Sequence, residues 1–167
     1  DAEGVALTLC SPQGSFSVRV PVWGEFNLYN LLAVTAAAHA LGYDVDDVVA
    51  KLPQLSSVPG RMEPVEAGSC VPVFVDFAHT ADALKAALSS LAQHAEGQLW
   101  CVFGCGGNRD KGKRPLMASA AEAHADHVIL TSDNPRDEKP ELIAADVMAG
   151  FEIPDLITVE LDRAKAI

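Results

Sequence analysis

Basic residues, long apolar runs and paired cysteines are all scarce in this sequence of 167 residues. It has 12 Lys or Arg against 23 Asp or Glu, which gives a formal net charge of -11. A basic stripe is the usual footprint of a nucleic-acid-binding domain, so this balance argues against a nucleic-acid partner. No apolar run reaches the roughly 18 residues that a membrane span requires. No signal peptide is visible, and we expect a protein without a membrane span.

The four cysteines form no CxxC pair and do not lie at zinc-finger spacing from histidine. They are Cys10, Cys70, Cys101 and Cys105. We therefore expect reduced thiols in a cytoplasmic protein. The hydrophobic content of 49% is enough for one or two compact domains with a real core. The chain does not begin with Met, and we expect both of its ends to be cut from a longer protein.

The pattern of strands and helices changes near residues 56–60. Before this point we predict strands at 5–9 and 16–20, and helices at 25–41 and 45–52. Gly42 would end the first helix, and Asp44 would cap the second. After this point we predict strands at 62–66, 71–77, 98–103, 127–131 and 156–159, and helices at 82–94, 115–125 and 140–150, with a last helix from Asp162. This alternation predicts an α/β fold with a mainly parallel sheet flanked by helices, and domains at 1–57 and 58–167.

Four of the twelve basic residues fall in one glycine-rich loop, 104–114, which follows the apolar stretch 99–103. They are Arg109, Lys111, Lys113 and Arg114. Backbone N–H groups and cations at the carboxyl end of a strand favour anionic ligands, although a solvated turn would have the same composition. Residues 107–114 nearly match a Walker A loop, but Arg114 replaces the Ser or Thr that holds magnesium. A dinucleotide fingerprint fails too, because Arg109 replaces its third glycine.

Three predicted strands end in polar segments. These are residues 76–80, the glycine-rich loop, and residues 131–136. If the strands are parallel, the three segments gather at one edge of the sheet, where open α/β folds bind ligands. Asp76, Arg109, Asp133 and Arg136 would then face a common cleft.

Five segments, in the same order as in the family, resemble the Mur ligases of peptidoglycan synthesis. They are residues 24–33, 58–63, 75–84, 103–115 and 132–140. Within that family, the segments most resemble the MurE type, which adds meso-diaminopimelate to UDP-N-acetylmuramoyl-L-alanyl-D-glutamate. Departures are small: the family more often has Tyr at Phe77, Pro at Ala81 and Asp at Asn108.

The resemblance implies a fragment that holds the end of a central ATPase domain and most of a Rossmann-like C-terminal domain. The phosphate loop, the magnesium ligands, the carbamylated lysine and the UDP-binding domain of such ligases have no counterpart here. We therefore expect the fragment alone to be inactive, and no catalytic residue is assigned. The full-length enzyme would use ATP and Mg²⁺ to form an acyl phosphate that the incoming amine attacks. It is expected to act as a monomer.

By the resemblance, the ATP-binding residues are Asn27, Asn30, Arg61, Asp76 and His79. The two asparagines would lie near the adenine, and Asp76 would accept the ribose hydroxyls. Without the resemblance, ordinary roles remain open: helix packing for the asparagines, a helix N-cap for Asp76, a structural loop role for His79 and a solvated Arg61.

The resemblance assigns the incoming amino acid to Arg109, Asp133, Asn134, Pro135 and Arg136. Diaminopimelate has a distal carboxylate that lysine lacks, and Arg136 can bind it bidentately beside Arg109. Asp133 and Asn134 would bind the adjacent ammonium and carboxylate groups. Without the resemblance, Asp-Asn-Pro is an ordinary turn. Lysine-adding relatives lack this arginine, and we would not expect the motif in a folylpolyglutamate synthetase-like ligase.

Two alternatives to this function stay open. One is a lysine-adding Mur ligase, and the other is a non-catalytic Rossmann-like module that binds nucleotides or anions. Glu122, His124 and His127 resemble a metal cluster, but they span a helix end and a strand start, which favours a solvated helix terminus. We therefore expect no metal site among them. His39 and His94 are expected to be ordinary helix residues.

Overall fold

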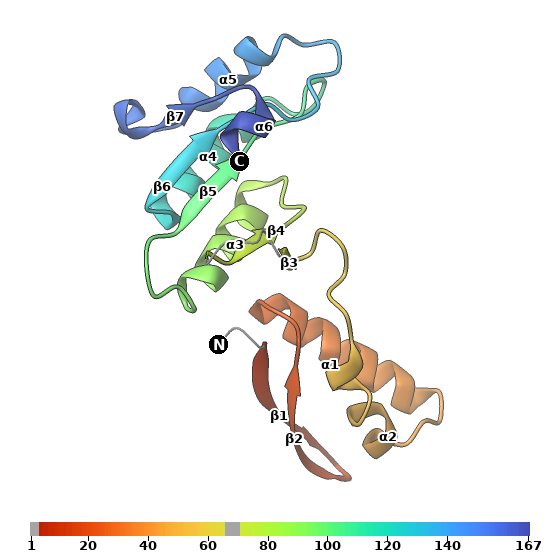
Figure 1. Cartoon of the computed structure of the whole chain (residues 1–167). Helices are drawn as coiled ribbons and strands as arrows, with labels where there is room; N and C mark the ends of the chain where they lie inside the picture. Colours follow the sequence, from red (N-terminus) through yellow and green to blue (C-terminus); the bar gives the residue numbers. More distant parts are fainter. Residues whose placement is uncertain (1–3, 66–70) are drawn as a thin grey trace. The chain divides into compact units, whose positions relative to one another are not determined.

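The computed structural model describes residues 4–65 and 71–167 (Figure 1). The chain divides into two compact units, Asp1–Phe77 and Ala78–Ile167. Each unit has its own hydrophobic core and is described separately. In the part of the chain that the structure describes, no helix combines the length and the apolar character that crossing a membrane requires.

The first unit begins with an antiparallel hairpin of β1 (Val5–Ser11) and β2 (Gly14–Val20). Ser11 and Gly14 face each other across a two-residue turn. The hairpin packs with α1 (Glu25–Ala40), α2 (Val45–Val49) and the 3-10 helix η1 (Leu52–Gln54). Their shared core consists of Leu9, Val20, Val22, Leu31, Val45, Val49 and Leu52.

Helix α1 ends as predicted. Gly42 has a φ of 93°, and the Tyr43 N–H donates to the Ala38 carbonyl (3.1 Å), which is the bonding of a glycine-terminated helix. The predicted helix 45–52 is shorter in the structure, because the α-helical bonding of α2 stops at Val49. Asp44 occupies the N-cap position, but its side chain makes no capping hydrogen bond, so the predicted cap is wrong.

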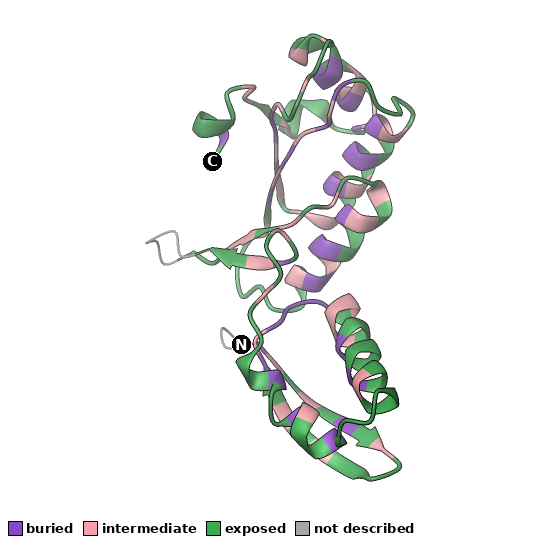
Figure 2. Cartoon of the chain, turned by 90° about the vertical axis from the view of Figure 1, so that its right-hand side faces the viewer, coloured by how far each residue is buried: buried purple, intermediate pink, exposed green. Residues whose placement is uncertain are grey.

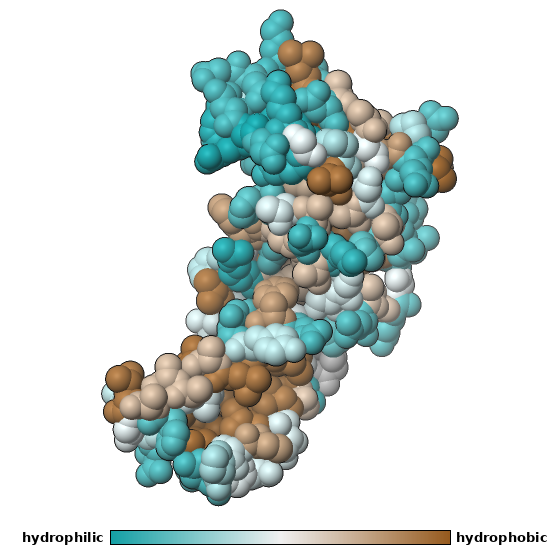
Figure 3. Space-filling view, turned by 180° about the vertical axis from the view of Figure 1, so that it is seen from behind, coloured by the Kyte–Doolittle hydropathy of each residue, from teal (hydrophilic) through white to brown (hydrophobic). Residues whose placement is uncertain are grey.

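Helix α1 is apolar on two opposite faces. Leu31 and Thr35 are buried toward the core, whereas Tyr29, Leu32 and Val34 are more than half exposed. Figure 3 shows apolar side chains at the surface of this unit. A helix with apolar residues on opposite faces is typical of an element covered on both sides.

The last element of the first unit is a short antiparallel pair, β3 (Glu63–Val65) with β4 (Val73–Val75). The prediction that the strand at 71–77 belongs to the parallel sheet is wrong in its pairing. The connection of seven residues between β3 and β4 is too short for the crossover that parallel strands need, so the two strands pair as a hairpin.

The second unit has the predicted α/β architecture. Its parallel sheet has the order β5 (Trp100–Phe103), β6 (His127–Leu130), β7 (Thr158–Val159). The helices are α3 (Ala81–Ala92), α4 (Lys113–His124), α5 (Pro140–Met148) and α6 (Arg163–Ala166), with a 3-10 helix η2 (Pro154–Leu156). In Figure 2 the three long helices lie on one side of the strands and turn buried residues toward them.

The core of this unit lies between the sheet and α3, α4 and α5. Its buried members are Leu84, Leu88, Cys101, Phe103, Cys105, Met117, Ala118, Ala121, Val128, Leu130, Ile143, Ala144, Val147 and Phe151. Cys10, Cys101 and Cys105 are free thiols, and Cys70 lies outside the described residues. Burial raises the pKa of Cys101 to about 12, so this thiol is a core residue.

Candidate functional site

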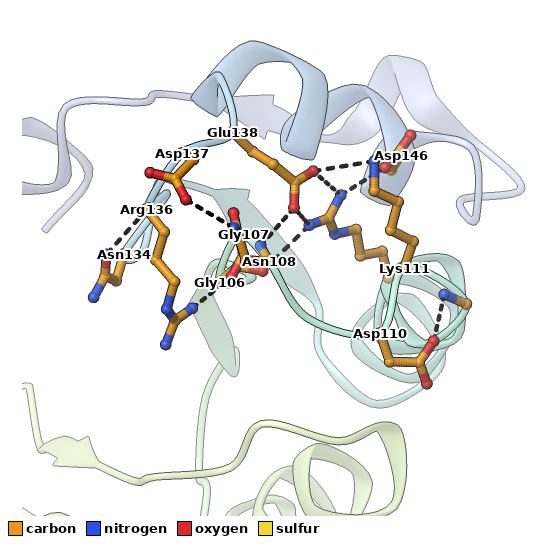
Figure 4. Close-up of polar contacts among 12 residues, drawn as sticks. Gly106, Gly107, Asn108, Asp110, Lys111, Asn134, Arg136, Asp137, Glu138 and Asp146 are labelled. Carbon is orange, nitrogen blue, oxygen red and sulfur yellow. Dashed lines mark hydrogen bonds and ion pairs between the residues drawn. The ribbon is translucent and has the colours of Figure 1, made fainter.

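Two loops meet at the carboxyl edge of the parallel sheet, one after β5 and one after β6 (Figure 4). The Gly107 N–H donates to the Asn134 carbonyl (2.9 Å), which joins them directly. Glycine is required by this approach, because a Cβ at Gly104 would lie 2.4 Å from the Thr131 carbonyl oxygen. A Cβ at Gly107 would lie 1.9 Å from the carbonyl oxygen of Pro135. Two of the three predicted polar segments therefore meet here. The third, residues 76–80, begins in the first unit and continues into the second, where its His79 carbonyl accepts Lys113 Nζ of the glycine-rich loop.

The predicted substrate residues of the β6 loop surround Gly106. A Cβ built at Gly106 would lie 3.1 Å from Arg136 Nη1 and 3.7 Å from Asp133 Oδ2. Arg136 has a φ of 49°, its backbone N–H donates to Asn134 Oδ1 (3.2 Å), and its Nη1 donates to the Gly107 carbonyl. Asp133, Asn134 and Arg136 are exposed. The loop is thus a turn, as its sequence alone indicates, and the turn presents its polar side chains to solvent.

Arg109 lies on the neighbouring loop and is exposed. It follows Asn108, whose Nδ2 donates to Asp137 Oδ2 (2.9 Å) and whose φ is 52°. The structure thus places Arg109 and Arg136 on two loops that are joined by hydrogen bonds, at the edge where both were predicted to lie.

Arg114 does not act as a loop cation open to ligands, contrary to the sequence-based prediction. Its side chain is fully buried, and its Nη1 donates to Asp146 Oδ2 (2.7 Å) and Glu138 Oε2 (3.0 Å). Its Nη2 donates to Glu138 Oε1 (2.9 Å) and the Gly106 carbonyl (3.3 Å). The sequence does hold a signal for this burial. Arg114 shares the helical spacing of the buried residues Met117, Ala118 and Ala121 in α4.

Two other cations of this loop also have partners. Lys111 Nζ lies 3.2 Å from Glu138 Oε2, and Lys113 Nζ donates to the His79 carbonyl (2.7 Å). The pKa of Glu138 falls to about 2, chiefly through its hydrogen bonds from Arg114 and from the Asn108 N–H. The four-cation loop is therefore largely a structural element, and the ligand-facing role rests on Arg109.

Asn27 and Asn30 are three positions apart and form a hydrogen-bonded pair on one face of α1. Asn27 Nδ2 donates to the Trp23 carbonyl (2.7 Å), and Asn30 Nδ2 donates to Asn27 Oδ1 (3.2 Å). Asn27 is half-buried and Asn30 is exposed. Asn27 thus secures the start of the helix and orients Asn30, whose amide reaches solvent.

Arg61 and Asp76 meet at a tight turn of the first unit. Asp76 Oδ2 accepts the Met62 N–H (2.9 Å), and the Phe77 N–H donates to the Gly60 carbonyl (2.7 Å). The Arg61 guanidinium lies 5.6 Å above the centre of the Phe77 ring. Met62 has a φ of 47° and is buried, so the Asp76 carboxylate holds a strained turn from which Arg61 projects.

The ordinary roles considered for Asp76 and His79 are only partly correct. The N-cap of α3 is Thr80, whose Oγ1 accepts the Ala83 N–H (3.3 Å), so Asp76 is not a helix cap. His79 is exposed in the second unit, where its carbonyl accepts the Lys113 side chain. The predicted ATP-binding residues therefore come from both units, with Asn27, Asn30, Arg61 and Asp76 in the first.

Residues 60–167 match the family described as Mur ligase, glutamate ligase domain. The chain belongs to the Mur ligase family. A UDP-N-acetylmuramoyl-L-alanyl-D-glutamate--2,6-diaminopimelate ligase of Coxiella burnetii is 47% identical over 166 residues, covering 99% of this chain and 34% of the relative. The ligase of the same name in Pseudomonas aeruginosa is 47% identical over 164 residues, with 98% and 34% covered. The chain thus spans about a third of the length of these relatives.

Solved structures give the same relationship. One with the same ligase name is 46% identical, with a TM-score of 0.67 and coverage of 99% of this chain and 34% of that one. A Mycobacterium tuberculosis folylpolyglutamate synthase complexed with ADP and AMPPCP is 25% identical, with a TM-score of 0.78 and coverage of 98% and 37%. The resemblance read from the five sequence segments is confirmed.

The Mur ligase match and the fold give slightly different limits for the C-terminal part. The match begins at residue 60, whereas the compact units separate at Phe77. The difference is the β3–β4 hairpin, which matches the family domain but groups with the first unit. The predicted boundary at 57/58 stays a prediction.

Glu122 and His127, two members of the weak metal candidate, have structural partners in this Mur ligase chain. Glu122 accepts the backbone N–H groups of Glu152 and Ile153 (2.8 and 2.9 Å). The His127 ring stacks on Trp100, with ring centres 4.2 Å apart. Within residues 4–65 and 71–167, no group of three His, Cys, Asp or Glu side chains is arranged to hold a metal ion.

Acid should weaken the second unit through Glu138. Its pKa is about 2 in the folded chain against an ordinary 4.5, so the unfolded chain binds more protons between these values. The stabilisation is therefore complete above about pH 4.5 and is lost as the pH falls through about 2. We expect thermal unfolding temperatures measured from pH 6 to 2 to fall less steeply in Glu138→Gln than in the wild type. Equal slopes would assign the acid sensitivity to other carboxyl groups.

Proposed function

We propose that this chain is the part of an ATP-dependent ligase that binds meso-diaminopimelate for addition to UDP-N-acetylmuramoyl-L-alanyl-D-glutamate. The observation that carries the proposal is the joined pair of loops with Asp133, Asn134, Pro135 and Arg136 on one and Arg109 on the other. The relatives named as diaminopimelate ligases, at 47% identity over nearly the whole chain, support it.

The recognition chemistry follows from the charges. Diaminopimelate ends in an ammonium and a carboxylate at its distal carbon, so a selective site needs an anion and a cation side by side. Asp133 and Arg136 lie together over Gly106 and supply both. A guanidinium has five N–H donors, so the contact of Arg136 with Gly107 is compatible with bidentate binding of a carboxylate. Lysine would leave that guanidinium without its carboxylate.

The reaction proposed is amide formation by way of an acyl phosphate. The γ-phosphoryl group of ATP is transferred to the D-glutamyl carboxylate, and ADP leaves. The neutral amine of diaminopimelate attacks the carbonyl carbon, and the tetrahedral intermediate loses phosphate and a proton to give the amide. The residues of this chain act by holding the amino acid so that its amine meets the activated carbonyl. We propose that the protein acts in the cytoplasm, where ATP and the nucleotide precursor occur, and that it is monomeric.

ATP would contact Asn27, Asn30, Arg61, Asp76 and His79. The exposed amide of Asn30 suits the adenine edge, and the exposed Arg61 guanidinium suits the adenine face or the phosphates. Asp76 accepts the Met62 N–H at the turn, and its carboxylate is the proposed acceptor for the ribose hydroxyls. No group of three His, Cys, Asp or Glu in residues 4–65 and 71–167 is arranged to hold a metal ion, and we assign no Mg²⁺ ligand among them.

The test is amide formation by the full-length gene product. It is incubated with ATP, UDP-N-acetylmuramoyl-L-alanyl-D-glutamate and either meso-diaminopimelate or lysine, and the UDP-linked product and free phosphate are measured. We expect product with diaminopimelate and a much lower kcat/KM with lysine. Equal use of lysine would support the lysine-adding alternative. Nucleotide binding without any amide product would support the non-catalytic module.

A further inference from the structure

The carboxylate of Glu138 joins the two loops of the site at four points. Oε1 accepts the Asn108 N–H (2.6 Å) and Arg114 Nη2 (2.9 Å). Oε2 accepts Arg114 Nη1 (3.0 Å) and lies 3.2 Å from Lys111 Nζ. All four donors belong to the β5 loop or the first turn of α4, whereas Glu138 itself follows the β6 loop (Figure 4).

The backbone that Glu138 fixes is the backbone next to the two site arginines. Asn108 precedes Arg109 and has a φ of 52°, and Arg136 has a φ of 49°. Asparagine adopts this conformation readily, whereas for arginine it is uncommon and needs support from the surrounding structure. The Glu138 carboxylate accepts the Asn108 N–H (2.6 Å), and the Glu138 N–H donates to the Pro135 carbonyl (3.0 Å), which closes the turn that contains Arg136.

Arg114 makes the connection rigid. It is fully buried, and its charge is permanent because a guanidinium is not deprotonated in proteins. A buried cation requires its carboxylate partners, and removing one of them is strongly destabilising. Asp146, on α5, is the second partner and bonds Arg114 (2.7 Å). Glu138 is thereby attached to both α4 and α5, which are elements of the core.

We propose that Glu138 is the positioning residue of the diaminopimelate site, holding the Asn108–Arg109 backbone against the Arg136 turn without touching the substrate. The inference rests on the proposed function for the identity of the ligand. According to this proposal, the four Glu138 contacts set the separation between Arg109 and Arg136. Misplacing binding groups by about 1 Å can cost around a hundredfold in rate.

Glu138→Gln and Asp146→Asn form a matched pair for the test. Each removes one negative charge from Arg114, so both should destabilise the second unit. Only Glu138 also contacts Asn108 and Lys111. In the full-length ligase we expect Glu138→Gln to raise the KM for diaminopimelate by about tenfold to a hundredfold, with the KM for ATP nearly unchanged. Asp146→Asn should leave both constants near their wild-type values.

A second readout does not depend on activity. In the ¹⁵N-labelled 167-residue chain, the backbone amide resonances of Asn108 and Arg136 should move in Glu138→Gln and stay in place in Asp146→Asn. If Glu138→Gln does not fold, Glu138→Asp retains the charge but is one methylene shorter. It cannot reach Arg114 and Asn108 together, so it should raise the same KM.

The outcomes separate the two ideas. An unchanged KM for diaminopimelate in Glu138→Gln, or an equal rise in Asp146→Asn, overturns the positioning role. A wild-type enzyme that forms no amide with diaminopimelate overturns the proposed function, and the amide resonances then decide the positioning role alone. Asn108 and Arg136 resonances that do not move in Glu138→Gln overturn it.

Discussion

Arg136→Ala in the full-length ligase should lower kcat/KM for meso-diaminopimelate by roughly thirty-fold to several thousand-fold. This range corresponds to about 2–5 kcal/mol, the loss when one partner is removed from a charge pair that the bound substrate shields from water. Lysine has no distal carboxylate, so its kcat/KM should fall much less. The measurement is the ratio of the two kcat/KM values before and after the substitution.

Arg163→Ala provides the control for loss of a nearby positive charge. Arg163 is exposed, and its Nη1 donates to the Ser132 carbonyl (3.2 Å) just before Asp133. It is not among the residues proposed to bind the distal carboxylate, so its removal should change the ratio little. If Arg136→Ala lowers both kcat/KM values equally, Arg136 has a structural or general role and the specificity proposal is wrong.

Arg114→Met should reduce the free energy of unfolding of the second unit by about 3–5 kcal/mol, the usual cost of breaking a buried ion pair. The substitution leaves Glu138 and Asp146 as like charges around an apolar side chain. Urea denaturation can be followed by Trp100 fluorescence in a Trp23→Phe background, because Trp100 then reports on the second unit alone. The side chain of Arg114 has no exposed area, but Glu138 and Asp146 are 18% and 42% exposed, so solvent can hydrate the remaining carboxylates, which places the loss toward the lower end of this range.

Lys111→Met is the matched comparison, since Lys111 pairs with the same carboxylate. Its side chain is 67% exposed, and exposed ion pairs contribute at most about 1 kcal/mol. A similar loss of unfolding free energy in the two variants would mean that the burial of Arg114 adds nothing to the strength of its ion pairs. A Glu138→Gln substitution added to Arg114→Met should restore part of the stability, because it removes one of the two remaining like charges.

Local patterns predicted most elements of the fold, because apolar periodicity and turn residues act over a few positions. The helices at Glu25 and Pro140 and the strands at 127 and 158 are found close to their expected places. The pairing of Val73–Val75 was predicted wrongly, because alternation of strands and helices does not show whether a short connection returns antiparallel. The Asp44 cap failed because a residue type suited to capping need not form the bond.

The site was predictable in part for a related reason. The meeting of residues 104–107 with 133–136 follows from parallel strands having their carboxyl ends at one edge. The burial of Arg114 was not predicted. Its positive charge indicated an exposed side chain, whereas its helical spacing from the buried residues of α4 indicated a core position. Its partners Glu138 and Asp146 lie 24 and 32 residues away, and no local pattern joins them. Asp76 likewise has a backbone partner, Met62, that only the folded turn reveals.

The outer face of α1 has a consequence for the chain in solution. Between Glu25 and His39 this helix has no charged residue, so its exposed apolar face has nothing on it that repels a second copy. The net charge of -11 repels a second molecule only over a distance set by the electrostatic screening length. At physiological ionic strength that distance shrinks to about 8 Å. Added salt therefore screens the repulsion and leaves the attraction between apolar faces, so we expect any self-association of the isolated chain to be stronger in salt than in dilute buffer.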